Sequence, residues 1–167
     1  MTMIETNLET VRARIAAACR AAGRDASSVT LLAVSKTFDA QAIEQAHCAG
    51  QIDFGENYIQ EAVQKIERLR HLPLQWHCIG PVQSNKTRLV AEHFDWVHTV
   101  DRLKVAQRLS EQRPAGLSAL QVCIQVNVDA GAAKSGVAPP QALALAQAVC
   151  PAGPAFAWSH EHPRSSS

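Results

Sequence analysis

The sequence has little net charge and no long apolar run. Its 167 residues carry a formal net charge of +1, and 47% of them are hydrophobic while 19% are charged. This small net charge gives no whole-molecule reason to expect nucleic acid or an anionic membrane surface as a partner. No run approaches the roughly 18 apolar residues that a membrane span needs. Length and composition therefore predict one ordinary soluble globular domain.

Targeting signals and paired cysteines are also lacking. Residues 1–23 alternate charged with apolar residues and contain no basic segment followed by an apolar core and a cleavage site, so no secretory signal is predicted. The five cysteines are odd in number and widely scattered, without a Cys-x-x-Cys pair. We therefore expect reduced thiols in a cytoplasmic protein.

Several motifs with well-understood chemistry are missing as well. There is no Gly-x-Gly-x-x-Gly, no Walker phosphate loop and no Gly-x-Ser-x-Gly elbow, so dinucleotide, nucleoside triphosphate and serine-hydrolase functions lack support. His160 and His162 flank Glu161, but no second pair of ligands stands at a recognised spacing. The sequence therefore predicts no metal site.

The sequence does contain a regular alternation of strand and helix patterns. Apolar residues from Ile4 to Ala18 recur every three or four positions, which predicts a helix that Gly23 ends. Residues 29–35, "VTLLAVS", predict a short parallel strand buried on both faces. Further strands are predicted at 51–55, 74–79, 95–100 and 117–129, and further helices at 40–50, 59–69, 85–94, 102–109 and 139–150. This order is typical of a parallel α/β protein.

Lys36 directly follows the first predicted strand, with no turn residue between them. A surface lysine is the ordinary interpretation, because lysines are rarely buried. However, ligands of parallel sheets bind at the carboxyl ends of the strands. A partly desolvated amine there would have a lowered pKa, and a neutral amine attacks an aldehyde to form a Schiff base. Lys36 is therefore a candidate site residue.

Other candidates follow later strands, each with a plainer alternative. Asn57 is predicted to cap the next helix, as Asp39 and Asp101 are, and it can also lie at the rim of the same pocket as Lys36, since the two interpretations are compatible. His77 lies within the third strand, where a core histidine is the commoner case. Ser84 or Asn85 can cap a helix whose free N–H groups bind an anion, and Lys134 is either a second site lysine or a solvated loop charge.

Taken in order, the blocks "LLAVSKT", "FGENYIQE", "WHCIGPVQSNK", "RLVAEHFDWVHTVDRLKVAQRLSEQRP" and "KSG" closely resemble the pyridoxal-phosphate homeostasis protein family, also called YggS or PROSC proteins. The resemblance runs from about Ile4 to Cys150. It implies an α/β fold of the parallel (β/α) TIM-barrel type, related to the N-terminal barrel of alanine racemase. It also implies a cytoplasmic protein that carries pyridoxal 5′-phosphate (PLP) as a Schiff base and takes part in PLP homeostasis without established catalysis.

The resemblance also implies roles for individual residues. Lys36 matches the Schiff-base lysine, Asn57 and His77 fall in blocks that line the cofactor side, and Lys134 matches a second lysine that can receive or pass on PLP. The implied partners are PLP and PLP-requiring apoenzymes, with neither nucleic acid nor membrane. Two alternatives remain open: a PLP-dependent racemase or decarboxylase, for which no second acid/base residue is evident, and a fragment without function of its own.

The chain is short for this fold, since a closed eight-stranded barrel takes about 250 residues. We therefore expect an incomplete barrel of about five strands in residues 1–150 and an irregular, non-family tail in 151–167. Back-translation of residues 158–164, read one base later, can spell Gly-Leu-Met-Ser-Ile-Pro, as in the family, so a truncation or frameshift after about Cys150 is predicted. The phosphate-binding part would then be missing. Family members are expected to be monomers, whereas the open sheet edge of this chain predicts self-association.

Overall fold

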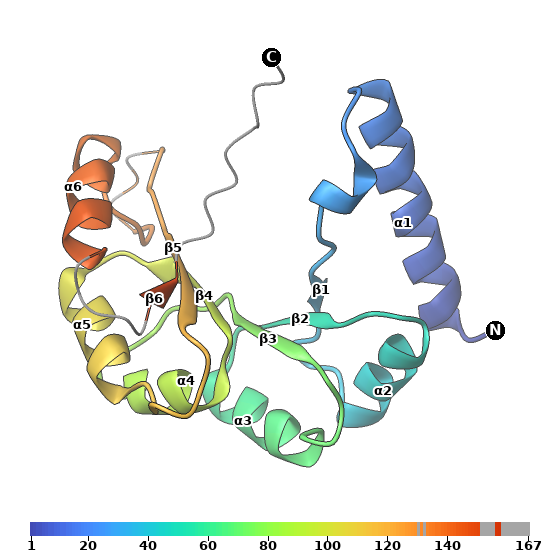
Figure 1. Ribbon diagram of the computed structural model, residues 1–167, viewed down its shortest axis with the longest axis horizontal. Coiled ribbons are helices and arrows are strands. Elements are labelled where there is room, and N and C mark those ends of the chain that lie inside the picture. Colours follow the sequence, from blue (N-terminus) through green and yellow to red (C-terminus); the bar gives the residue numbers. More distant parts are fainter. Residues whose placement is uncertain (130, 132, 151–155, 158–167) are drawn as a thin grey trace. The chain divides into compact units, whose positions relative to one another are not determined.

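The computed structural model describes residues 1–129, 131, 133–150 and 156–157, and its helices and strands alternate along the chain (Figure 1). Within these residues the α-helices are α1 (Met3–Ala21), α2 (Ala40–Cys48), α3 (Ile59–Arg68), α4 (Thr87–His93), α5 (Leu103–Gln112) and α6 (Pro139–Val149). The strands are β1 (Ala33–Val34), β2 (Asp53–Glu56), β3 (Gln75–Cys78), β4 (Trp96–Val100), β5 (Leu120–Ile124) and β6 (Phe156–Ala157). The chain forms two compact units, Met1–Trp76 and His77–Ser167.

The first unit contains α1, α2 and α3 together with the parallel pair β1 and β2. Val34 of β1 stands opposite Gly55 of β2. The ring of Phe54, which is 1% exposed, lies 5.9 Å from the ring of Trp76 between centroids. The other deeply buried side chains of this unit are those of Ile43, Ala62, Ile66 and Leu69. Burial of these apolar side chains packs the helices against the strand pair.

Local signals in the sequence explain where the first helices begin and end. Thr2 and Glu5 form a capping box at the start of α1, and the carboxylate of Asp39 accepts a hydrogen bond of 2.9 Å from the Ala42 N–H at the start of α2. Gly23 follows the end of α1 with φ +63° and Gly50 follows α2 with φ +81°. Such positive φ values suit glycine and end a helix.

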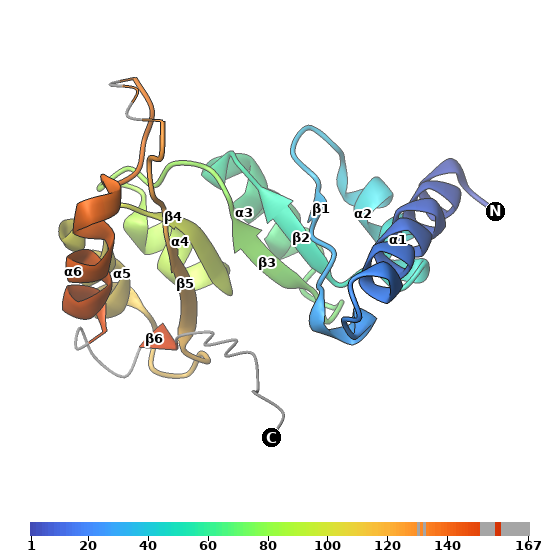
Figure 2. The same ribbon diagram turned by 90° about the horizontal axis from the view of Figure 1, so that it is seen from above.

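The second unit builds parallel pairs between β3 and β4, β4 and β5, and β5 and β6. Helices α5 and α6 lie next to each other in both views (Figures 1 and 2). Fully buried side chains from α4, α5 and α6 and from the strands form the core of this unit: Val90, Val97, Val100, Ala106, Leu109, Leu120 and Val149. The predicted parallel α/β organisation is confirmed in each unit.

Three strand predictions differ from the structure. The first strand, predicted over 29–35 and buried on both faces, is only Ala33–Val34, and Val34 is 47% exposed. In the described residues β1 pairs with β2 alone, so its other edge receives no strand that would extend or cover it. The strand predicted over 117–129 is confined to β5. A sixth strand, β6, lies within the predicted irregular tail, and the rest of 151–167, with His160 and His162, falls outside the described residues.

None of the helices in the described residues is both long enough and apolar enough to cross a membrane.

Candidate functional site

Lys36 lies in a tight turn at the carboxyl end of β1. The carbonyl of Ser35 accepts a hydrogen bond of 3.0 Å from the N–H of Phe38, so Ser35 and Phe38 are the first and last residues of the turn. Thr37, at the third position, has φ +68°. This is the arrangement of a type II turn, in which the third position favours glycine. A β-branched residue with positive φ is a genuine outlier, so surrounding contacts must hold Thr37 there.

The side chain of Lys36 is exposed, in contrast to the partly desolvated amine that the sequence predicted. The difference arises because Lys36 is the second residue of the turn and so lies beyond the end of the strand, whereas Ser35 before it is 5% exposed. An exposed amine on a fixed turn is accessible to a small aldehyde from solution.

Asn57 lies at the same strand edge as Lys36. Val34 stands opposite Gly55 in the strand pair. Lys36 comes two residues after Val34, and Asn57 comes two residues after Gly55. The predicted capping role of Asn57 is wrong, because the N-cap of α3 is Tyr58 and no side chain bonds there. The Oδ1 atom of Asn57 is buried and has no hydrogen-bond partner among the described residues. It is therefore an acceptor available to a bound group.

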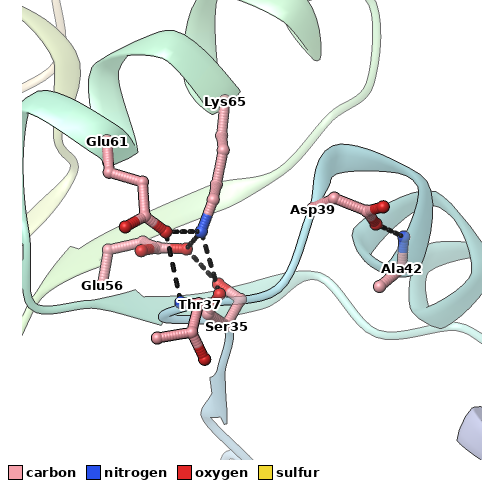
Figure 3. A network of polar contacts seen from close by, with 7 residues as sticks. All are labelled: Ser35, Thr37, Asp39, Ala42, Glu56, Glu61 and Lys65. Carbon is pink, nitrogen blue, oxygen red and sulfur yellow. Dashed lines mark hydrogen bonds and ion pairs between the residues drawn. The ribbon is translucent and has the colours of Figure 1, made fainter.

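A buried ionic network lies beneath the turn and links it to β2 and α3 (Figure 3). The Nζ of Lys65 lies 2.9 Å from the carbonyl oxygen of Ser35, 2.9 Å from Oε1 of Glu56 and 2.6 Å from Oε1 of Glu61. The hydroxyl of Ser35 donates to the same Glu56 oxygen over 2.6 Å, and the N–H of Thr37 donates to Glu61 over 3.2 Å. An ammonium group has three donors, so Lys65 is saturated.

Burial makes this network energetically important. Glu56 is 0% exposed and Lys65 is 8% exposed, so each needs the other as a counter-charge. The side chain of Glu61 is 39% exposed, and the hydrogen bond from Lys65 lowers its pKa, with smaller contributions from the Lys65 charge and the Thr37 N–H. Sequence reasoning missed Lys65, Glu56 and Glu61.

His77 lies in β3 and is 6% exposed, as expected for a core histidine. Its Nδ1 atom lies 2.9 Å from Nε2 of His98 on the neighbouring strand β4, and its ring stacks on that of Trp96 with centroids 5.4 Å apart. Burial, followed by the neighbouring His77, lowers the pKa of His98. Sequence reasoning missed His98, although its spacing of two from Trp96 places both on one face of a strand.

Lys134 lies on a loop after β5, where it is exposed and pairs with the carboxylate of Asp129. The side-chain amide of Asn127 donates to the carbonyl of Lys134 over 3.2 Å and so ties the loop to its own base. The N–H of Gly136 donates to the carboxylate of Asp101 over 3.2 Å. Asp101 therefore braces this loop instead of capping α5, whose N-cap is Arg102.

The start of α4 is not capped by either residue that the sequence offered. The N-cap of α4 is Lys86, which makes no side-chain capping bond, and Ser84 contributes only its carbonyl, which accepts from the Thr87 hydroxyl over 3.1 Å. The predicted capping role of Ser84 or Asn85 is therefore wrong. Across the part of the chain that the structure describes, no group of three or more His, Cys, Asp and Glu side chains is arranged to hold a metal ion.

Residues 6–161 match the family model of the alanine racemase N-terminal domain. The chain belongs to this family. This confirms the predicted fold class, a parallel (β/α) barrel type, with fewer strands in the described residues than the eight of a closed barrel.

Curated relatives of this chain carry the name of the family that its sequence resembles. The chain is 63% identical over 149 residues to the pyridoxal phosphate homeostasis protein of Pseudomonas aeruginosa, covering 89% of this chain and 65% of that protein. The protein of the same name from Escherichia coli K12 is 53% identical over 152 residues, with the same coverage of 89% and 65%. The chain thus spans about 65% of the length of these curated relatives.

A solved structure, PipY of Synechococcus elongatus with PLP bound, is 40% identical to this member of the alanine racemase N-terminal family. It aligns with a TM-score of 0.65 over 81% of this chain and 63% of PipY.

Proposed function

We propose that this chain is a PLP-binding protein of the homeostasis type and that Lys36 holds PLP as a Schiff base. The observation that carries the proposal is the placement of Lys36, whose exposed amine stands on a fixed turn at a strand end, on the same edge as the unsatisfied Oδ1 of Asn57. The names of the curated relatives and the PLP bound in PipY support this choice of cofactor.

The residues present fit a group that carries an aldehyde and polar ring substituents. The amine of Lys36, once it has lost a proton to water, adds to the aldehyde carbon, and a water molecule leaves as the C=N bond forms. Asn57 offers an acceptor to a donor on the bound group. When bound, PLP supplies a reactive carbonyl that another amine can take over. Lys134 is proposed as such a second amine, and His77 as a residue of the cofactor side.

The proposed role is to store PLP and hand it to PLP-requiring apoenzymes in the cytoplasm, without catalysis by the chain itself. A racemase would need a second acid/base group on the opposite face of the cofactor. Racemisation and decarboxylation assays with a panel of amino acids distinguish the two functions. Turnover that depends on Lys36 would replace the carrier role with an enzymatic one.

Borohydride trapping tests the attachment of PLP directly. The chain is incubated with PLP, reduced and mapped by peptide mass spectrometry, with PipY as the positive control. We expect label on Lys36 in the wild-type chain, loss of that label in Lys36→Ala, and retention in Lys104→Ala, whose lysine is exposed on α5. If PipY is labelled and the wild-type chain is not, the chain is a fragment without PLP-binding function.

We also propose that residues 1–150 form the family part of the chain and that 151–167 arise from a shifted reading frame, although the match of the family model continues to residue 161. The encoding DNA decides this: the alternative frame after the codon for Cys150 must continue with family-like sequence. A stop codon or unrelated sequence in that frame would overturn it.

Self-association through the edge of β1 that pairs with no strand in the described residues is a further part of the proposal. Val34 is 47% exposed and Phe38 is 56% exposed there, and unpaired strand edges with apolar side chains recruit other chains. Light scattering during gel filtration measures the state of the chain. A monodisperse monomer at all concentrations tested would contradict this expectation.

A further inference from the structure

The two peptide groups that flank Lys36 are both held by side chains of α3. The carbonyl of Ser35, immediately before Lys36, accepts from the ammonium group of Lys65 over 2.9 Å. The N–H of Thr37, immediately after Lys36, donates to the carboxylate of Glu61 over 3.2 Å. Lys65 and Glu61 also bond each other over 2.6 Å, so a single ion pair clamps the backbone on both sides of Lys36 (Figure 3).

The turn needs such a clamp because of Thr37. Its φ of +68° is disfavoured for a β-branched residue, so without external contacts this backbone would relax toward negative φ. Relaxation would rotate the peptide groups next to Lys36 and move the base of its side chain. The contacts that oppose relaxation come from Lys65 and Glu61, together with the hydrogen bond from Phe38 to Ser35 within the turn.

The clamp is itself anchored in the core. The fully buried carboxylate of Glu56 accepts from both Lys65 and the Ser35 hydroxyl, which fixes the ammonium group relative to β2. The three donors of the Lys65 ammonium group are occupied by Ser35, Glu56 and Glu61, so none is left for another partner. Two lysines therefore lie close together with different tasks, since Lys36 is exposed and Lys65 is buried.

We propose that Glu61 and Lys65 are positioning residues that hold the turn Ser35–Phe38 in the conformation in which the Lys36 amine meets an aldehyde. This inference rests on the proposed function, because it assigns to Lys36 the bond with PLP. It predicts that loss of Glu61, the more exposed member of the clamp, slows the reaction of Lys36 without unfolding the unit around it.

The first test is Glu61→Ala in the full chain, with Glu67→Ala as the matched control. Both glutamates lie on α3 with similar side-chain exposures of 39% and 44%, but Glu67 pairs with Arg70. In Glu61→Ala the Thr37 amide should exchange its hydrogen about tenfold faster, and the PLP label on Lys36 should form about tenfold more slowly, since a hydrogen bond to a charged group is lost. Exchange of the α3 amides should stay unchanged.

The second test asks whether the conformation of the turn is what matters. Glycine adopts positive φ without strain, so Thr37→Gly should restore most of the labelling rate in the Glu61→Ala background. Lys65→Arg, which keeps the charge, should label faster than Lys65→Met. A melting curve for each variant separates an altered turn from an unfolded chain.

The results have distinct meanings. Equal labelling and exchange in Glu61→Ala and Glu67→Ala, or no rescue by Thr37→Gly, would overturn the positioning role. A wild-type chain that takes no PLP label overturns the proposed function instead. In that case the exchange of the Thr37 amide alone decides whether the clamp holds the turn.

Discussion

Replacing Lys65 with methionine should destabilise the chain far more than an ordinary surface substitution. The change keeps much of the side-chain volume but removes the cation that faces Glu56, whose carboxylate is 0% exposed. Breaking a buried ion pair by removing one partner costs about 3–5 kcal/mol, because an unpaired charge stays buried. The bond to Glu61 adds little, since that side chain is 39% exposed and an i,i+4 pair at such exposure is worth about 0.3–0.5 kcal/mol.

Urea unfolding monitored by tryptophan fluorescence measures this change in the free energy of unfolding. Lys104→Met is the matched control, since Lys104 is exposed and its substitution should change stability by about 0.5 kcal/mol or less. If the unpaired Glu56 charge is the cause, Glu56→Gln should suppress the defect, and the double variant should be more stable than additivity predicts by about 2–3 kcal/mol. A Lys65→Met defect below about 1 kcal/mol, or strict additivity with Glu56→Gln, would refute the ion-pair reasoning.

Three further expectations concern pH, glycine and cysteine. Because its pKa is lowered in the folded state, Glu61 contributes stability that is present above its unfolded pKa of about 4.3 and is lost as the pH falls through its folded pKa. Urea titrations from about pH 5 downward should therefore show a smaller loss of stability in Glu61→Gln than in the wild-type chain. Gly136→Ala should lower the free energy of unfolding by about 1–3 kcal/mol, because Gly136 has φ +114° and a Cβ there would lie 2.7 Å from a backbone nitrogen. Gly116→Ala is the control and should be nearly neutral, because open space surrounds Gly116. Burial raises the pKa of the Cys78 thiol to about 11, so a thiol reagent at about pH 8 should modify exposed Cys48 before Cys78, and Cys78 only on unfolding. Equal rates of modification of Cys48 and Cys78 would contradict the buried placement of Cys78.

The elements of the fold could be predicted because their signals are local. Helix α2 begins after its N-cap Asp39 and ends before Gly50, as predicted. The apolar spacing of α3 predicted its start at residue 59. Burial of a strand is not local, since it depends on how many neighbours pair with it. "VTLLAVS" has the composition of a central strand, but only Ala33–Val34 is a strand here, with one neighbour in the described residues.

The capping predictions for Asp101 and Asn57 failed at residues that directly follow a strand and precede a helix. Asp101 stands at the expected distance before α5, yet it bonds the N–H of Gly136, 35 residues away. Asn57 precedes α3, yet among the described residues its amide oxygen accepts no hydrogen bond. Both residues follow strands at the edge where parallel sheets bind ligands. At such an edge a polar residue before a helix can either cap that helix or contact a loop or ligand, and its position in the sequence is the same in both cases.

Lys65 was missed because a lysine in a helix is ordinarily exposed, yet its position carried a usable signal. It lies three residues after Ala62 and directly before Ile66, so it falls on the apolar stripe that packs against the strands. A charge in that stripe must be buried with an opposite charge, and the carboxylate nine residues earlier, Glu56, ends the strand against which the helix packs. The same geometry links the ion pair to the proposed site. The Lys65 ammonium group that pairs with Glu56 also donates to the carbonyl of Ser35, in the peptide group before Lys36.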